Sequence, residues 1–309
     1  MVLFNKFLFR GDTMEFIKLN GGSYYIDAPT NIGVYVFKNK NCMLIDSGIN
    51  NTQARKIDEV LKKNNLHVKY IVNTHSHMDH CGGNHYFTAE YPGCIVYAAS
   101  TEGLYMENPH LYPSMLFSSN PIKDLWKDKK PLKVDFELEA GVMKFNDEKF
   151  EIIPLPGHSP QNTGVLTSDK VCYLGDCIFS EEILSKYSFP YLYSVEDSIN
   201  TLNMIKDIDG DYFVIGHSDK YYTKDEILKL SNLNLKNIQS YIDQILELLE
   251  QPLTREDLLE NLLILNNLTC DIWQYHIYFS SLSAFVSYLY DKDTLEASVE
   301  DGKCYYYQK

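Results

Sequence analysis

Short runs of β-branched and apolar residues recur along the first two thirds of the chain, and glycine, proline or polar residues bound most of them. Runs of this length and composition predict buried strands. The predicted strands cover residues 33–37, 42–46, 68–73, 94–98, 150–153, 170–175 and 212–216.

Several of these strands are separated by segments whose apolar residues recur every three or four positions, as on one face of a helix. Strands that alternate with helices indicate sheets covered by helices, and therefore an α/β fold. The two clearest helices are residues 52–64, with Ile57, Val60 and Leu61 on one face, and residues 195–208, with Ile199, Leu202 and Ile205.

Three histidines and an aspartate follow the strand predicted at 68–73, in the string Thr74-His75-Ser76-His77-Met78-Asp79-His80. Residues two apart in an extended segment point the same way, so His75 and His77 can converge on one metal ion. A turn at Met78 would direct Asp79 and His80 toward a second position. Nitrogen ligands with carboxylates suit zinc, and iron and manganese accept the same donors.

Three later elements each place one ligand-type residue directly after a glycine: His158, Asp176 and His217. Such a pair alone is uninformative, and the indication comes from the order of the three behind the histidine string. Together the elements supply seven ligand side chains, enough for two ions. Two adjacent divalent ions can convert water into hydroxide and polarise the bond that it attacks.

The string H-x-H-x-D-H-x-G-G, with Asp46 and the three later elements, resembles the metallo-β-lactamase-fold hydrolase superfamily over about residues 15–218. The resemblance implies a four-layer αββα sandwich, with the ligand loops at one edge of two packed sheets. It also implies ligand roles. His75, His77 and His158 would hold one ion, Asp79, His80 and His217 the other, and Asp176 would bridge both. Asp46 would hydrogen-bond around the ligands and orient them.

Departures from subfamily patterns narrow the predicted function. The bridging position is Asp176, where one group of antibiotic-hydrolysing relatives has cysteine, and no secretory signal is evident; antibiotic hydrolysis is therefore disfavoured. The metal motif resembles that of glyoxalase II, but no basic cluster that could hold glutathione is apparent. We predict a dinuclear zinc hydrolase, with Asp79 as catalytic residue, that cleaves an ester, thioester, lactone or similar bond. The alternatives are a mononuclear iron dioxygenase of the persulfide type and a non-catalytic binding module.

Two segments rich in aromatic residues and methionine, around residues 101–127 and 187–193, are candidates for the substrate pocket. Such walls favour an apolar acyl or ring group over a bare charge. The same residue types also fill gaps in protein cores, which leaves a purely structural role open. The candidate pocket residues are Tyr105, Met106, Tyr112, Met115, Phe117, Tyr191 and Tyr193.

Residues 219–309 change in character, and we expect a C-terminal, mostly helical domain. Thr223 and Glu226 form a capping box at the start of a long helix that ends before Pro252. Helices at 255–264 and 270–290 follow, and Asp301-Gly302 predicts a β-hairpin. This order resembles a winged-helix module, which often binds DNA. With 15 acidic against eight basic residues, however, packing on the hydrolase core or forming a dimer is the favoured role.

Charge and composition exclude other classes. The net charge of −14 disfavours nucleic-acid partners, so the expected partner is a small-molecule substrate. No apolar run approaches the roughly 20 residues that span a bilayer. Seven cysteines without tight spacing indicate a reducing cytoplasm. Residues 1–14 read as an N-terminal extension, too short and too charged for a signal peptide.

Overall fold

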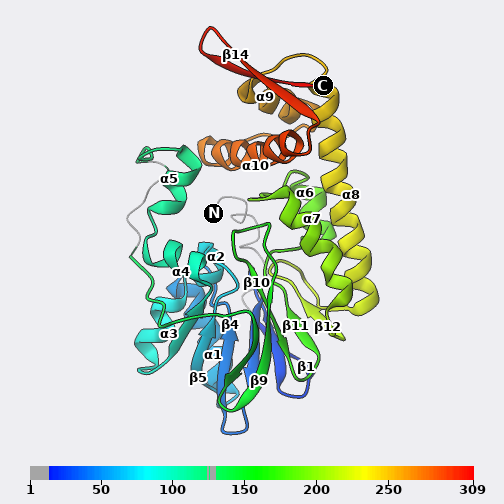
Figure 1. Ribbon diagram of the computed structural model, residues 1–309. Coiled ribbons are helices and arrows are strands. Elements are labelled where there is room, and N and C mark those ends of the chain that lie inside the picture. The colour runs from blue at the N-terminus through cyan, green and yellow to red at the C-terminus, as the bar shows by residue number, and fades with distance from the viewer. Residues whose placement is uncertain (1–13, 124, 126–129) are drawn as a thin grey trace.

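Two β-sheets packed face to face form the centre of the molecule, and helices cover their outer faces (Figure 1). The computed structural model describes residues 14–123, 125 and 130–309. The predicted N-terminal extension lies outside the described residues except for Met14. The α/β fold and its four-layer αββα arrangement, expected from the resemblance, are confirmed.

The first sheet contains seven strands in sequential order. Its first four strands pair antiparallel, and the remaining pairs are parallel. The strands are β1 (Glu15–Asn20), β2 (Ser23–Asp27), β3 (Ile32–Val36), β4 (Asn41–Ile45), β5 (His67–Val72), β6 (Ile95–Ala98) and β7 (Phe136–Glu137).

The second sheet has six strands in the order β13-β12-β11-β10-β9-β8. All its neighbours are antiparallel except β11 and β12, which pair in parallel. The strands are β8 (Gly141–Phe145), β9 (Glu148–Pro154), β10 (Thr163–Thr167), β11 (Val171–Tyr173), β12 (Tyr212–Val214) and β13 (Tyr222–Thr223).

Alternation along the strands produces the layers. In β4, Met43 belongs to the apolar cluster between the two sheets, whereas its neighbours Cys42 and Leu44 belong to the cluster under the helices. That outer cluster includes Ile57 of α1 (Asn51–Lys63) and Phe87 of α3 (Asn84–Glu90). Because successive side chains of a strand point to opposite faces, a run of buried residues can fill two cores at once.

All seven predicted strands are present, with ends shifted by one or two residues. The predicted helix at 52–64 is α1, and that at 195–208 is α7 (Val195–Met204) followed by a 3-10 turn. The unpredicted strands include the edge strands of both large sheets, namely β1, β7, β8 and β13. An edge strand pairs on one side only and tolerates charged residues, so its hydrophobic pattern is weak. Two interior strands, β2 and β10, were also missed.

The C-terminal segment has the predicted order of elements: α8 (Lys224–Leu248), α9 (Arg255–Leu265), α10 (Ile272–Asp291), β14 (Leu295–Glu300) and β15 (Lys303–Gln308). The capping box at Thr223 and Glu226 is present, and Asp301 and Gly302 both have positive φ, as the predicted hairpin turn requires. Its winged-helix character stays a prediction.

The hydrophobic core runs across the predicted boundary between residues 218 and 219. One cluster contains Phe213 of β12, Tyr241 of α8 and Leu282 of α10. Strand β13 lies beyond the boundary yet pairs with β12. In Figure 1, α8 runs along α7, and α10 lies over the end of the sandwich beside α5 (Leu111–Phe117). The division into domains stays a prediction, and the packing joins the two parts closely.

Across the described ranges, no helix is both long and apolar enough to cross a membrane. None of the seven cysteines, all of which lie in the described ranges, forms a disulfide; five are buried and two are exposed.

Candidate metal centre

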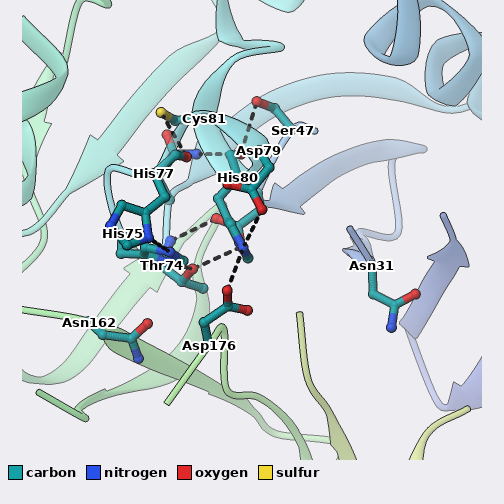
Figure 2. Close-up of polar contacts among 12 residues, drawn as sticks. Asn31, Ser47, Thr74, His75, His77, Asp79, His80, Cys81, Asn162 and Asp176 are labelled. Carbon is teal, nitrogen blue, oxygen red and sulfur yellow. Dashed lines mark hydrogen bonds and ion pairs between the residues drawn. The ribbon is translucent and has the colours of Figure 1, made fainter. Parts of the chain in front are cut away.

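The seven predicted ligand residues come together at one edge of the sandwich, each just beyond the end of a strand or in the short helix α2 (Met78–Cys81). The histidine string follows β5, and the predicted turn at Met78 is the one-turn helix α2. His158, Asp176 and His217 follow β9, β11 and β12. Figure 2 shows the Asp176 carboxylate directed toward His80, and a dashed line marks their contact.

His75, His77 and His158 form the first group. Nδ1 of His77 lies 3.1 Å from Nε2 of His75 and 2.9 Å from Nε2 of His158. Three ring nitrogens therefore converge on one point, as the alternation of His75 and His77 along an extended segment led us to expect.

Asp79, His80, Asp176 and His217 form the second group. Oδ2 of Asp176 lies 3.3 Å from Nε2 of both His80 and His217. The same oxygen lies 3.7 Å from Nε2 of His158 in the first group. Asp176 thus stands between the two groups, which is where a shared ligand has to be.

The outward-facing nitrogen of four histidines has a fixed hydrogen-bond partner. Nδ1 of His158 donates to the Tyr191 carbonyl at 3.0 Å, and Nδ1 of His217 donates to the Pro29 carbonyl at 2.9 Å. His80 donates to Asp46 at 2.7 Å, and His75 lies 3.0 Å from the Thr74 hydroxyl. A proton held on Nδ1 leaves the Nε2 lone pair directed inward.

Asp46 lies where the resemblance suggested, behind the ligands. It is buried, and its carboxylate accepts hydrogen bonds from the Thr74 amide and the Thr74 hydroxyl, both at 2.8 Å, as well as from His80. Its φ of 68° is left-handed, a conformation that aspartate and asparagine tolerate better than most residues. One side chain therefore positions His80 and the start of the histidine string together.

The two groups differ in electrostatics. Burial lowers the pKa of His75 and His77 well below the ordinary histidine value. Burial also opposes charge on His217, but Asp176 and Asp79 outweigh it and raise the His217 pKa to about 9. The first group is thus a set of neutral nitrogen donors. The second group pairs carboxylates with protonated imidazoles, and a cation can replace those protons.

Glycines at two ligand loops are required by close packing. A Cβ at Gly216 would lie 2.0 Å from Oδ1 of Asp176, so no other residue fits between Asp176 and His217 without displacement. Gly175 has a φ of +61°, and its Cβ would meet the Thr74 hydroxyl at 2.7 Å. The glycine–ligand pairs in the sequence therefore have a steric cause.

Glu102 of α4 (Ser100–Glu107), a fully buried carboxylate, was not predicted from the sequence. One oxygen accepts from the Ser76 amide and hydroxyl at 2.9 and 2.6 Å. The other accepts from the Ser159 hydroxyl and the Gln161 amide at 2.7 and 2.9 Å. Glu102 therefore ties the histidine string to the His158 loop. No local pattern marks it, because its partners are distant in sequence.

The donor set fits divalent metal ions. Oδ2 of Asp79 and Nε2 of His80 are buried, and neither makes a hydrogen bond of good geometry to a described residue. Buried polar atoms rarely stay unpaired, and each group offers three or more ligand atoms of the types that zinc prefers. Cys81 and Cys177 belong to neither group.

A cavity of about 1160 Å³, its open mouth included, lies over the ligands. Four predicted pocket residues line it, namely Tyr105, Met106, Tyr112 and Tyr191, and Met115 lines a smaller adjoining space. Phe117 and Tyr193 are not among the lining residues of either. Phe117 packs its ring against His276 of α10, and Tyr193 is 45% exposed.

Other parts of the wall were not predicted. Phe179, Ile183 and Tyr187, in and around α6 (Glu181–Lys186), line one side, and Trp273 and Ile277 of α10 line another. Lys130 is the one lysine or arginine among the described lining residues. The α10 residues could not be found from a motif, because only the folding of the C-terminal segment brings them to the cavity.

Fold and site together define a metal-dependent hydrolase, and comparisons with known proteins name the family. Residues 26–217 match the model of the metallo-beta-lactamase superfamily, and the chain belongs to it. That range contains all seven clustered residues. The cluster indicates a divalent metal site.

Relatives extend this result. A hydroxyacylglutathione hydrolase of Prochlorococcus marinus (strain MIT 9312) is 26% identical over 204 residues, 65% of this chain and 68% of that protein. A metallo-beta-lactamase family protein of Thermus thermophilus superposes with a TM-score of 0.72 at 16% identity, covering 96% of this chain and 98% of that one. A beta-lactamase domain protein of Burkholderia ambifaria superposes with a TM-score of 0.73 at 14% identity, covering 96% of this chain and 94% of that one. At these identities the two structures show a shared fold, which extends over the C-terminal segment.

Proposed function

We propose that this chain is a dinuclear metallohydrolase that cleaves a thioester, or a related ester or lactone, of a small molecule. The observation that carries the proposal is the position of Asp176, whose Oδ2 lies within 3.7 Å of a histidine nitrogen from each group. The relative named hydroxyacylglutathione hydrolase, a thioester hydrolase by that name, supports the bond type.

The proposed ligand sets follow the two groups. His75, His77 and His158 would hold one ion, and Asp79, His80 and His217 the other, with Asp176 shared. The three neutral histidines of the first set favour zinc, and iron or manganese accepts the same donors. Two bound ions would lower the pKa of a water molecule and polarise the scissile carbonyl.

The remaining steps belong to this chain's own residues. Asp79 lies at the cavity floor with Oδ2 3.2 Å from Nε2 of His217, where its carboxylate can orient a nucleophile and pass a proton to the leaving group. Hydrogen bonds to Asp46 and Glu102 hold the ligand loops in place relative to one another. The apolar walls exclude bulk water from the reacting atoms.

The residues that line the cavity also restrict which substrates can bind. Apart from the histidines, Lys130 is the single cationic side chain among the described residues around the cavity. A thiol carrier recognised through several negative charges would find few partners, whereas an apolar acyl group matches the aromatic and aliphatic walls. We therefore propose an apolar acyl thioester or lactone.

A hydrolysis panel on zinc-loaded protein tests the proposal, with one apolar substrate each for thioester, lactone, ester and phosphodiester bonds. We expect turnover of the thioester, ester or lactone and its loss in Asp176→Ala. If none of the four substrates is hydrolysed, or if only the phosphodiester is, the proposed function is contradicted. Metal content separates the alternatives: near two zincs per chain supports a dinuclear hydrolase, one iron the dioxygenase, and none a binding module.

We further propose that residues 219–309 form a C-terminal domain that shapes the pocket, and that the protein works in the cytoplasm. Trp273 and Ile277 in the cavity wall support the first proposal, and seven cysteines without a disulfide support the second. The excess of acidic residues opposes nucleic-acid binding by this segment. A homodimer stays a prediction, and the solution mass would test it.

A further inference from the structure

We propose that Ser281 of α10 is a positioning residue of the metal centre, which orients His158 through a single peptide bond of the main chain. This inference rests on the ligand role of His158 in the proposed function and deepens it. It makes the C-terminal segment a working part of the first group of ligands, in addition to a part of the cavity wall.

The peptide bond between Tyr191 and Leu192 connects His158 to α10. Its carbonyl oxygen, on Tyr191, accepts the hydrogen bond from Nδ1 of His158 at 3.0 Å. Its amide, on Leu192, donates to the Ser281 hydroxyl oxygen at 3.2 Å. Because a peptide unit is planar, a partner that fixes the N–H also fixes the direction of the C=O. Ser281 therefore holds the acceptor on which the orientation of the His158 ring depends.

Ser281 makes a second hydrogen bond to the same stretch of main chain. Its side chain is fully buried, and its hydroxyl donates to the Pro190 carbonyl at 3.1 Å. Ser281 thus bridges the residues before and after Tyr191. Hydrogen bonds in such a chain polarise one another, so the bond from the Leu192 amide makes the Tyr191 carbonyl a stronger acceptor. A stronger acceptor opposite Nδ1 makes Nε2 of His158 a more basic metal ligand.

The same face of α10 also holds the Tyr191 side chain. Ile277, one helical turn before Ser281, belongs to the apolar cluster that contains the Tyr191 ring. The Tyr191 hydroxyl hydrogen-bonds Ser280, and the ring lies 5.7 Å from that of His158. With both its main chain and its side chain held by one helix, Tyr191 has little freedom to turn its carbonyl away from His158.

Ser231 of α8 provides a matched comparison. It is buried, and its hydroxyl donates to the Leu202 carbonyl of α7 at 2.6 Å. Both serines therefore belong to the C-terminal segment, and both hydrogen-bond main chain that precedes it. Ser231 holds the interior of a helix, whereas Ser281 holds the peptide unit on which a ligand histidine is anchored.

The test compares Ser281→Ala with Ser231→Ala in the zinc-loaded full chain. Each variant loses one buried hydroxyl, so both should have a lower Tm than wild type. Competition with a chromophoric chelator gives the affinities for the bound ions. Ser281→Ala should weaken one of them by roughly 3- to 10-fold, less than the roughly 10- to 100-fold typical of a residue that contacts a ligand directly. Ser231→Ala should leave every zinc affinity unchanged.

A second readout follows the hydrogen bond itself. In zinc-loaded protein with isotope-labelled histidine, the Nδ1–H signal of His158 is assigned by its loss in His158→Asn. In Ser281→Ala this signal should shift, and its proton should exchange faster with solvent. The Nδ1–H signal of His217, whose acceptor is the Pro29 carbonyl, should stay in place and is the internal control.

If Ser281→Ala is destabilised but keeps its zinc affinities and its His158 signal, Ser281 has only a structural role and the inference is wrong. If Ser281→Ala does not fold, Ser281→Cys decides by the same measurements, because a thiol of similar size is a weak donor and a weak acceptor. Neither readout depends on turnover. A protein that binds zinc and hydrolyses no substrate refutes the proposed reaction alone, whereas a wild type that binds no metal refutes both proposals.

Discussion

The metal-ligand edge and the cavity wall meet at His77, yet they are built in opposite ways. The ligand edge consists of short loops behind buried strands, and hydrogen bonds to Asp46, Glu102 and backbone carbonyls hold its side chains. The wall consists of aromatic and aliphatic residues on α4, α5, α6 and α10, held by packing. We propose that the first region sets the reaction and that the second selects the molecule that reaches it.

The comparison also separates what is shared within the family from what is specific to this chain. The family match ends at residue 217, the last clustered residue, whereas Trp273 and Ile277 of the wall lie beyond it. We therefore attribute the hydrolase chemistry to the matched range, and we propose that substrate choice depends on the segment beyond it. Substitutions in one region therefore test whether the other region responds.

The largest effect is expected at the ligands. His77→Ala should lose the ion of the first group, and Asp176→Ala should weaken both, because its carboxylate lies between the two groups. Hydrolysis should fall to background in each variant. Elemental analysis with activity assays measures this, and His67→Ala, an exposed histidine outside the groups, is the control. Full metal occupancy in both variants would refute the ligand assignment.

The next largest effect concerns the C-terminal segment. Leu282 is fully buried in the core that joins this segment to the second sheet. Leu282→Ala should lower the free energy of unfolding by about 2–5 kcal/mol. Ile264→Ala, at a position 68% exposed, should change it by less than about 0.5 kcal/mol. Urea unfolding gives both values.

Removing residues 224–309 entirely should leave an insoluble or unstable protein, since the outer face of the second sheet would be uncovered. A truncated protein that remains soluble, metal-loaded and fully active would show that the wall and the ligand edge are independent.

A smaller effect is expected behind the ligands. Asparagine at position 46 tolerates the left-handed backbone as aspartate does, but Asp46→Asn removes the negative charge opposite His80. Metal affinity should drop by roughly 10- to 100-fold, with little change in thermal stability. Asp293→Asn, at an exposed position that is also left-handed, is the matched control. Unchanged metal affinity in Asp46→Asn would show that Asp46 has only a structural role.

The smallest effect concerns the cap of α8. The Thr223 amide and Lys220 lower the pKa of Glu226 to about 2, from an ordinary value of 4.5. Because the folded pKa lies below the unfolded one, the stabilisation is complete above about pH 4.5 and is lost as the pH falls toward 2. Glu226→Gln should therefore cost about 0.5 kcal/mol at pH 7, with the difference shrinking in acid. Glu247→Gln, near the other end of α8, should not destabilise at any pH.

Local sequence determined the ligand edge and much of the framework. The histidine string and the glycine–ligand pairs follow predicted strands, so their placement at strand ends needed only the chain's own periodicity. The helices and hairpin of the C-terminal segment were also evident, because capping boxes and an Asp-Gly turn act over a few residues.

Tertiary structure alone decided the rest. Glu102 holds two loops more than 80 residues apart in sequence, and Trp273 reaches the cavity only because α10 packs on α5 and α7. The four edge strands were equally invisible, since pairing with a neighbour forms them. These features share one physical reason. Each depends on a partner far away in the chain, and neither periodicity nor local propensity carries information about such contacts until folding brings the partners together.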